Sequence, residues 1–162
     1  MDKGIALLVR MLQQAYDRKA WHGTNLRGSL RGLSPAEAAW RPGAGRHSIQ
    51  ELALHCAYWK YTVVRRLTGA KRGSFPLEGS NFFARPGIPS PQQWKDDLRL
   101  LEEMHRTLID TVGSLRDRDL LRKAPGGSGK VTIEAVVYGV ACHDVYHAGQ
   151  IQLIKRGMRQ GG

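Results

Sequence analysis

The chain of 162 residues has only two cysteines and fourteen acidic residues, and it has no long apolar run. No stretch reaches the length that spans a membrane, and Arg10 interrupts the short apolar run at the N-terminus, which argues against a signal peptide. A chain of this length can bury a sizeable core without disulfides. We therefore expect one soluble, cytoplasmic domain over residues 1–162.

The two cysteines, Cys56 and Cys142, fall inside predicted helices next to histidines. We interpret both as small buried apolar residues. Thiols near a functional site are the first alternative, and a disulfide, which a reducing cytosol disfavours, is the second.

Basic residues outnumber acidic ones by 25 to 14, which gives a formal net charge of +11. This excess raises nucleic acid as a partner, but lysine and arginine are scattered along the first half of the chain, and residues 90–124 are balanced. We find no arginine-rich tract and no recognition-helix motif. Nucleic acid is therefore not the expected partner, and the charge favours a small, anionic ligand.

Apolar residues recur at helical spacing in four segments, and no segment alternates as a strand would. Capping signals begin three of them: Ser48 with Glu51, Ser90 before Pro91, and Thr132 after a glycine-rich stretch. The sequence predicts long helices over residues 2–20, 48–69, 90–112 and 132–157, and one short helical turn at residues 34–37. The predicted fold class is all-α.

The second and third predicted helices are separated by about twenty residues, from Gly69 to Pro89, that are rich in glycine and proline. This connection is too long for a tight antiparallel hairpin. It predicts a crossover between helices 2 and 3 of a four-helix bundle.

His143 and His147 are four residues apart in the last predicted helix, on the stripe that its apolar residues bury. Residues at this spacing lie on one helix face, so both imidazoles could reach one metal ion. His55 holds a core-facing position on the second predicted helix. Three imidazoles from two helices would leave a coordination position open, as in catalytic zinc sites. The pattern predicts a metal-dependent enzyme, with a hydrogen-bonded structural cluster as the alternative.

The other three histidines are weaker candidates, because His105 has no histidine four residues away and His22 and His47 lie in predicted connections. We interpret His105 as a core or pocket-edge residue and His47 as a neighbour of the Ser48 cap, whereas His22 could line the mouth of a pocket.

Four further side chains are candidates for a role in catalysis or in orienting the metal ligands. Gln150 could hydrogen-bond a metal-bound water or substrate, or another helix. Glu51 could orient His55 or act as a general base, but its place in the capping box is the simpler interpretation. Asp144 and Tyr146 flank the buried stripe, where they could act behind the ligands.

Three segments resemble the DinB-like superfamily of small four-helix-bundle metalloproteins: residues 32–37, 48–55 and 143–151. The resemblance implies an up-down-down-up helix order and a divalent metal, usually zinc or nickel, held by His55, His143 and His147. It also implies a homodimer, because many members dimerise. Characterised relatives include bacillithiol-using transferases and a mycothiol-dependent maleylpyruvate isomerase, which suggests a transferase that activates a low-molecular-weight thiol.

Two other functions stay open. The same metal could activate water in a small-molecule hydrolase, with Glu51 or Asp144 as proton acceptor. The segment from His143 to His147 resembles the zincin helix poorly, because Asp144 stands where a glutamate belongs and the third ligand would come from upstream. A non-enzymatic binding protein with a basic surface is the other alternative.

Overall fold

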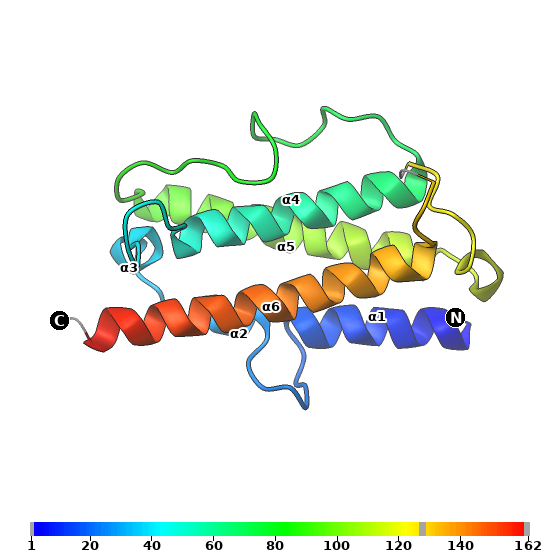
Figure 1. Ribbon diagram of the computed structural model, residues 1–162, viewed down its shortest axis with the longest axis horizontal. Coiled ribbons are helices and arrows are strands. Elements are labelled where there is room, and N and C mark those ends of the chain that lie inside the picture. The colour runs from blue at the N-terminus through cyan, green and yellow to red at the C-terminus, as the bar shows by residue number, and fades with distance from the viewer. Residues whose placement is uncertain (1, 127–128, 161–162) are drawn as a thin grey trace.

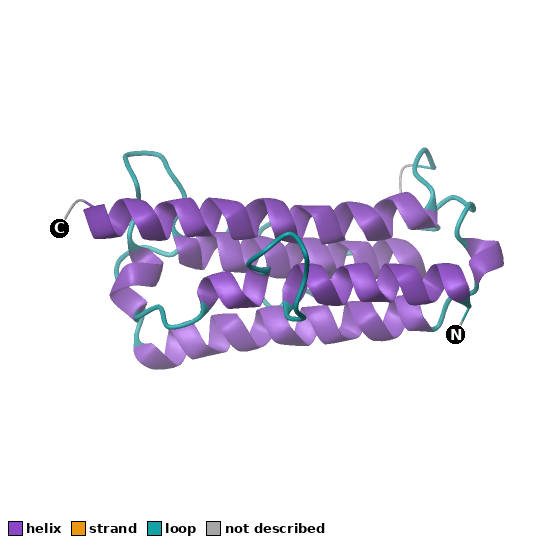
Figure 2. Cartoon of the chain, turned by 90° about the horizontal axis from the view of Figure 1, so that it is seen from below, coloured by secondary structure: helices purple, strands orange, loops and turns teal. Residues whose placement is uncertain are grey.

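Four long helices lie side by side in the computed structural model, which describes residues 2–126 and 129–160 (Figures 1 and 2). Helix α1 packs against α5 and α6, and α4 packs against the same two helices. The long helices are α1 (Lys3–Tyr16), α4 (Ile49–Thr68), α5 (Pro91–Gly113) and α6 (Ile133–Gln160). The short ones are α2 (Leu26–Leu30), α3 (Pro35–Ala39) and the 3-10 helix η1 (Asp117–Asp119).

The predicted all-α class is confirmed. Within the described ranges there is no strand, and the nearest feature is an isolated bridge between Lys123 and Thr132. The same ranges contain no helix that is long and apolar enough to cross a membrane.

The capping signals begin the helices where the sequence predicts. The Ser48 hydroxyl accepts a hydrogen bond from the backbone N–H of Glu51, and the Glu51 carboxylate accepts one from the N–H of Ser48. These two bonds satisfy donors that the first turn of a helix leaves free. The Ser90 hydroxyl likewise accepts from the N–H of Gln93 at the start of α5.

Two helix ends differ from the prediction. Helix α1 stops at Tyr16 rather than at residue 20, because Asp17 leaves helical geometry and the next two residues, Arg18 and Lys19, are exposed and have no apolar face to bury. Helix α6 continues past Gly157 to Gln160, and Met158 of this last turn packs against the core. The short α2, capped by the Asn25 side chain, was not predicted from the sequence.

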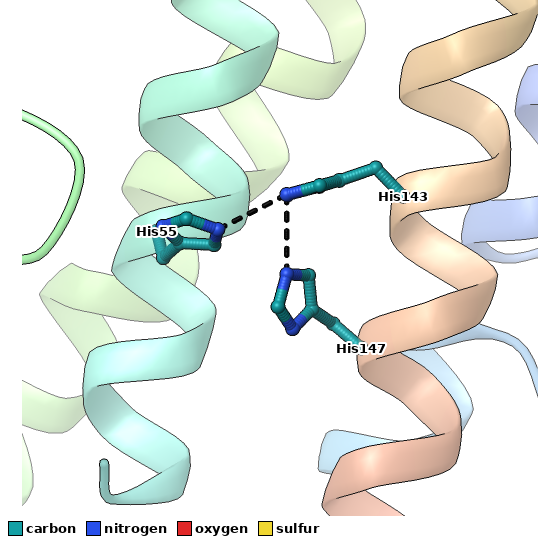
Figure 3. A group of neighbouring side chains, drawn as sticks. All are labelled: His55, His143 and His147. Carbon is teal, nitrogen blue, oxygen red and sulfur yellow. Dashed lines mark hydrogen bonds between the residues drawn. The ribbon is translucent and has the colours of Figure 1, made fainter.

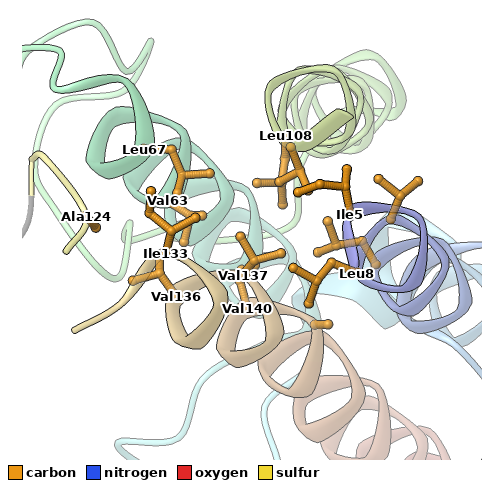
Figure 4. Close-up of a cluster of buried hydrophobic side chains, with 14 of the residues drawn as sticks. Ile5, Leu8, Val63, Leu67, Leu108, Ala124, Ile133, Val136, Val137 and Val140 are labelled. Carbon is orange, nitrogen blue, oxygen red and sulfur yellow. The ribbon is translucent and has the colours of Figure 1, made fainter. Parts of the chain in front are cut away.

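The apolar core has two clusters, one toward each end of the bundle. On α4 and α6, the cluster drawn in Figure 4 reaches to Val63 and Ala141. The other cluster resumes at Ala57 on α4 and at Ala148 on α6. Polar residues of both helices occupy the interval between the clusters, so the sequence places a polar layer in mid-bundle.

The cysteine interpretation is half correct. Cys56 is buried, whereas Cys142 is exposed on α6, and both are free. The difference arises because residue 142 lies on the solvent side of α6, one position before His143 on the buried side.

His105 is a core histidine, as expected, and it gives a prediction about pH. It is buried on α5, and its ring stacks on Tyr16 with centroids 3.9 Å apart. Burial lowers the pKa of His105 to about 3, against about 6.5 in an unfolded chain. Between these values the unfolded state binds more protons, so this group contributes stability that is fully present above about pH 6.5 and is lost as the pH falls.

His105→Phe keeps the ring stack and removes this titration. In zinc-free protein, we expect the slope of unfolding free energy against pH between pH 6.5 and 4 to fall by up to about one proton, or about 1.4 kcal/mol per pH unit. Urea unfolding followed by circular dichroism measures this slope. A variant with the parent's full slope would contradict the assignment.

Candidate metal centre

Three histidine side chains converge between α4 and α6 (Figure 3). The Nε2 atom of His143 lies 3.0 Å from that of His55 and 3.1 Å from that of His147. Two imidazole nitrogens bound to one zinc ion, each at about 2.0–2.1 Å, are about 2.9–3.4 Å apart at octahedral to tetrahedral angles. Both distances from His143 therefore fit one shared divalent ion, and the ligand atoms of all three histidines lie within 4.8 Å of one another.

In His55 and His147 the hydrogen bond at Nδ1 determines the tautomer of the ring, and so determines that Nε2 carries the lone pair. The Nδ1 atom of His55 lies 2.8 Å from the backbone carbonyl of Asn81, which can only accept, so this Nδ1 carries the proton. The Nδ1 atom of His147 lies 2.7 Å from the side-chain oxygen of Gln150. In the neutral rings, both Nε2 lone pairs then point at Nε2 of His143, which can donate to at most one of them. A bound cation would satisfy all three at once.

Burial keeps the three rings in the form that binds metal. His55 and His147 are each only 6% exposed, and the Nδ1 atom of His143 is buried without a hydrogen-bond partner among the described residues. Burial lowers the pKa of His55 to about 4 and that of His143 to about 3, and it also lowers the pKa of His147. All three are therefore neutral near pH 7, as metal coordination requires.

The crossover between α4 and α5 supplies residues that hold His55 in place. Asn81 has φ of 66°, a left-handed conformation that asparagine tolerates, and its side-chain oxygen accepts a hydrogen bond from the indole of Trp59 at 3.0 Å. The Phe82 ring stacks on His55 with centroids 4.1 Å apart. These contacts orient the imidazole and cover it, and the sequence offered no periodic signal for them.

Gln150 contacts a predicted ligand from within the same helix. Its side-chain oxygen accepts from His147, and its amide nitrogen donates to the Tyr146 hydroxyl at 3.1 Å. The structure therefore places both Gln150 and Tyr146 behind His147. The predicted contact of Gln150 with a bound water or substrate stays a prediction.

Removing the Gln150 acceptor should loosen the ligand that it orients. We expect Gln150→Leu to lower zinc affinity about 10–100-fold, because a ligand histidine loses the partner of its outer N–H. Competition with a chromophoric chelator measures this affinity. Gln152→Leu, the same substitution two residues along α6, is the matched control and should bind zinc as the parent does. Equal affinities in both variants would contradict the role of Gln150.

Glu51 is held by several donors at the start of α4. Besides the Ser48 backbone, its carboxylate accepts from the Arg41 guanidinium at 2.8 Å and from the backbone N–H of Arg85 at 3.3 Å. Burial raises the pKa of Glu51, but these hydrogen bonds outweigh it and hold the pKa at about 2. The capping box is thus present, and a catalytic role for Glu51 stays a prediction.

Asp144, next to His143 in sequence, points into the core. It forms a fully buried ion pair with Lys60 of α4, and its Oδ1 atom has no hydrogen-bond partner among the described residues. The Lys60 ammonium also lies 5.2 Å from the centroid of the Tyr16 ring. Lys60 was not singled out from the sequence, although it lies seven residues after Ala53 and three before Val63 on the buried face of α4.

A cavity of about 520 Å³ reaches His147 and Gln150. Its wall is mainly apolar, with the aromatic rings of Trp40, Phe82 and Tyr146, and Arg46 supplies a positive charge. The cavity has room for a small organic molecule beside the three histidines.

The remaining histidines lie outside the cluster. His47 hydrogen-bonds Glu51, as a neighbour of the cap would, and its ring stacks on Phe82 with centroids 3.7 Å apart in the wall of the cavity. His22 lines a different cavity of about 290 Å³, beside Cys142.

An all-helical protein with three converging histidines on two of its long helices belongs to the class of helix-bundle proteins with a candidate metal site. The chain belongs to the DinB superfamily, whose family model matches residues 18–151. This match covers α2 to α5 and most of α6, with all three histidines. No match among curated proteins is found.

Proposed function

We infer that this protein is a metal-dependent enzyme that acts on a small organic molecule, and that it transfers a low-molecular-weight thiol to an electrophile. One observation carries the proposal: three neutral imidazoles bring their Nε2 atoms together, with that of His143 about 3 Å from each of the other two, next to a cavity that a small molecule can enter. Imidazole ligands suit zinc and nickel, so we propose one of these ions.

In this proposal the residues around the metal site have two roles, metal binding and orientation of the ligand rings. His55, His143 and His147 would hold the ion, while Asn81 and Gln150 orient two of the rings. When bound, a divalent ion supplies Lewis acidity, which lowers the pKa of a thiol or of water to near neutrality.

The cavity favours an anionic substrate with an apolar or aromatic part. The side chains of Trp40, Phe82 and Leu52 would remove apolar surface from water, and Arg46 would pair with a carboxylate or phosphate. In the proposed reaction the thiol loses its proton to solvent water, its sulfur forms a bond to an electrophilic carbon, and the bond from that carbon to the leaving group breaks, so that the leaving group departs with the electron pair.

The contacts of the two candidate bases favour a transferase over a hydrolase. A hydrolase needs a group that accepts a proton from water. The Glu51 carboxylate is paired with Arg41, and Asp144 is buried against Lys60, so both are already engaged. A thiol, which is more acidic than water, depends less on such a base.

Two finer proposals concern architecture. We propose the up-down-down-up helix order, which the chain direction in Figure 1 supports, because α4 and α5 both begin at the end of the bundle where α6 finishes. A homodimer also remains a proposal, which sedimentation velocity tests.

The activity test uses protein loaded with zinc or nickel, in a Cys142→Ser background so that the exposed native thiol does not consume the electrophile. An activated aryl halide and an ester are each offered with and without added thiol, and loss of electrophile is followed. We expect consumption of the halide that requires both metal and thiol and that disappears in His143→Ala. Ester hydrolysis without thiol would favour the hydrolase, and inactivity toward both would overturn the proposed transferase.

A further inference from the structure

A second, smaller cavity reaches the histidine cluster from the other side. It has a volume of about 220 Å³ and lies between the second half of α4 and the first half of α6, whereas the larger cavity lies beyond His147. His143 lines the smaller cavity and His147 the larger. The histidine cluster therefore lies between two cavities, one on the His143 side and one on the His147 side.

The wall of the smaller cavity is apolar except at His143 and Arg66. Valine side chains of both helices line it, together with the ring of Trp59, and the Arg66 guanidinium supplies a positive charge. The Arg66 guanidinium lies 5.7 Å from the centroid of the Trp59 ring, as in a cation–π contact. Arg66 forms none of the ion pairs within 4.0 Å that join the described side chains.

Two features keep this cavity open and shaped. The indole N–H of Trp59 donates a hydrogen bond to the Asn81 side chain, which restricts the Trp59 ring to the rotamer that lines the cavity. Gly139 of α6 also lines the cavity, and a Cβ atom built there would meet no atom within 4 Å. Space beside Gly139 is therefore available to a ligand rather than filled by packing.

We propose that this cavity is a second ligand pocket of the metal centre, and that it takes a short, unbranched apolar chain with an anionic end. The chain would lie along Trp59 and Gly139, and Arg66 would pair with the carboxylate or phosphate. The proposal rests on the proposed function for the role of this ligand as one of two organic reactants. It deepens that function, because a hydrolase needs one organic substrate and a transferase needs two.

The test uses zinc-loaded protein labelled with nitrogen-15 and two probes, hexanoate and 6-mercaptohexanoate. The indole N–H signal of Trp59, assigned with Trp59→Phe, reports occupation of the small cavity. We expect both probes to shift this signal and to bind more tightly than their three-carbon counterparts, by up to roughly 50-fold, because each buried methylene contributes about 0.8 kcal/mol.

Gly139→Leu puts a side chain into the cavity, where an added Cβ atom meets no atom within 4 Å, and should abolish both the shift and the gain with chain length. Gly149→Leu is the matched control, since it makes the same substitution on the same helix at an exposed glycine whose added Cβ would also meet no atom within 4 Å. Arg66→Gln should lower hexanoate affinity about tenfold and leave the affinity for hexanol unchanged.

The outcomes separate the pocket from the thiol chemistry. If hexanoate shifts Trp59 but 6-mercaptohexanoate binds no tighter than hexanoate, the pocket stands and the thiol role in the proposed function fails. If neither probe perturbs Trp59, or if Gly139→Leu binds both probes as the parent does, the proposal is overturned, whatever metal the protein holds.

Discussion

Purified protein should hold about one divalent metal ion per chain, and His143→Ala should lose it. The loss should exceed 100-fold in affinity, which is the upper range for removing a group behind a ligand, because this substitution removes a ligand itself. His143 is the most informative choice, because its Nε2 lies within about 3 Å of the Nε2 atoms of both other rings. His55→Ala should behave in the same way. Mass spectrometry of tag-free protein gives the metal content, and chelator competition gives the affinity.

The control must be a histidine outside the cluster. His22→Ala changes an exposed imidazole of a loop and should keep the parent's metal content. Circular dichroism of each variant separates loss of metal from loss of fold. Parent protein that stays metal-free after reconstitution with zinc and with nickel would refute the metal centre. The histidines would then be a buried hydrogen-bonded cluster.

The parts of the fold that could be predicted depend on residues close together in sequence. The capping box of Ser48 and Glu51 is formed by residues three apart, and the pairing of His143 with His147 follows from one turn of helix. Such local patterns determine local geometry whatever the rest of the chain does. The all-α class followed from the same periodicity.

The residues that orient His55 could not be found in this way. Asn81 and Phe82 lie in the crossover, where no period relates sequence to position, and they reach α4 only because the segment folds back along the bundle (Figure 1). Lys60 differs, because its spacing from Ala57 and Val63 already put it on the apolar face of α4. A lysine is so rarely buried that this spacing alone does not identify Lys60 as a core residue.

The buried pair of Lys60 and Asp144 should be the most sensitive charged contact of the fold. Both side chains are fully buried, so Lys60→Met would leave the Asp144 carboxylate in the core without its cation. Burial raises the pKa of Asp144, and Lys60 acts in the opposite direction. We expect Lys60→Met to lower the free energy of unfolding by about 3–5 kcal/mol, measured by urea unfolding at pH 7.

Two further variants show whether charge or packing is responsible. The double variant Lys60→Met with Asp144→Leu removes both charges, so it should recover most of the lost stability, since apolar residues of similar volume can replace a buried pair. Arg99→Met breaks the exposed pair with Asp96, where both side chains are about half exposed, and should cost less than about 1 kcal/mol. If Lys60→Met cost no more than Arg99→Met, the pair would be solvated. If the double variant were no more stable than Lys60→Met alone, the stability lost at these positions would come from packing and not from charge. The polar layer beside the histidines would then be stabilised by the close fit of its side chains.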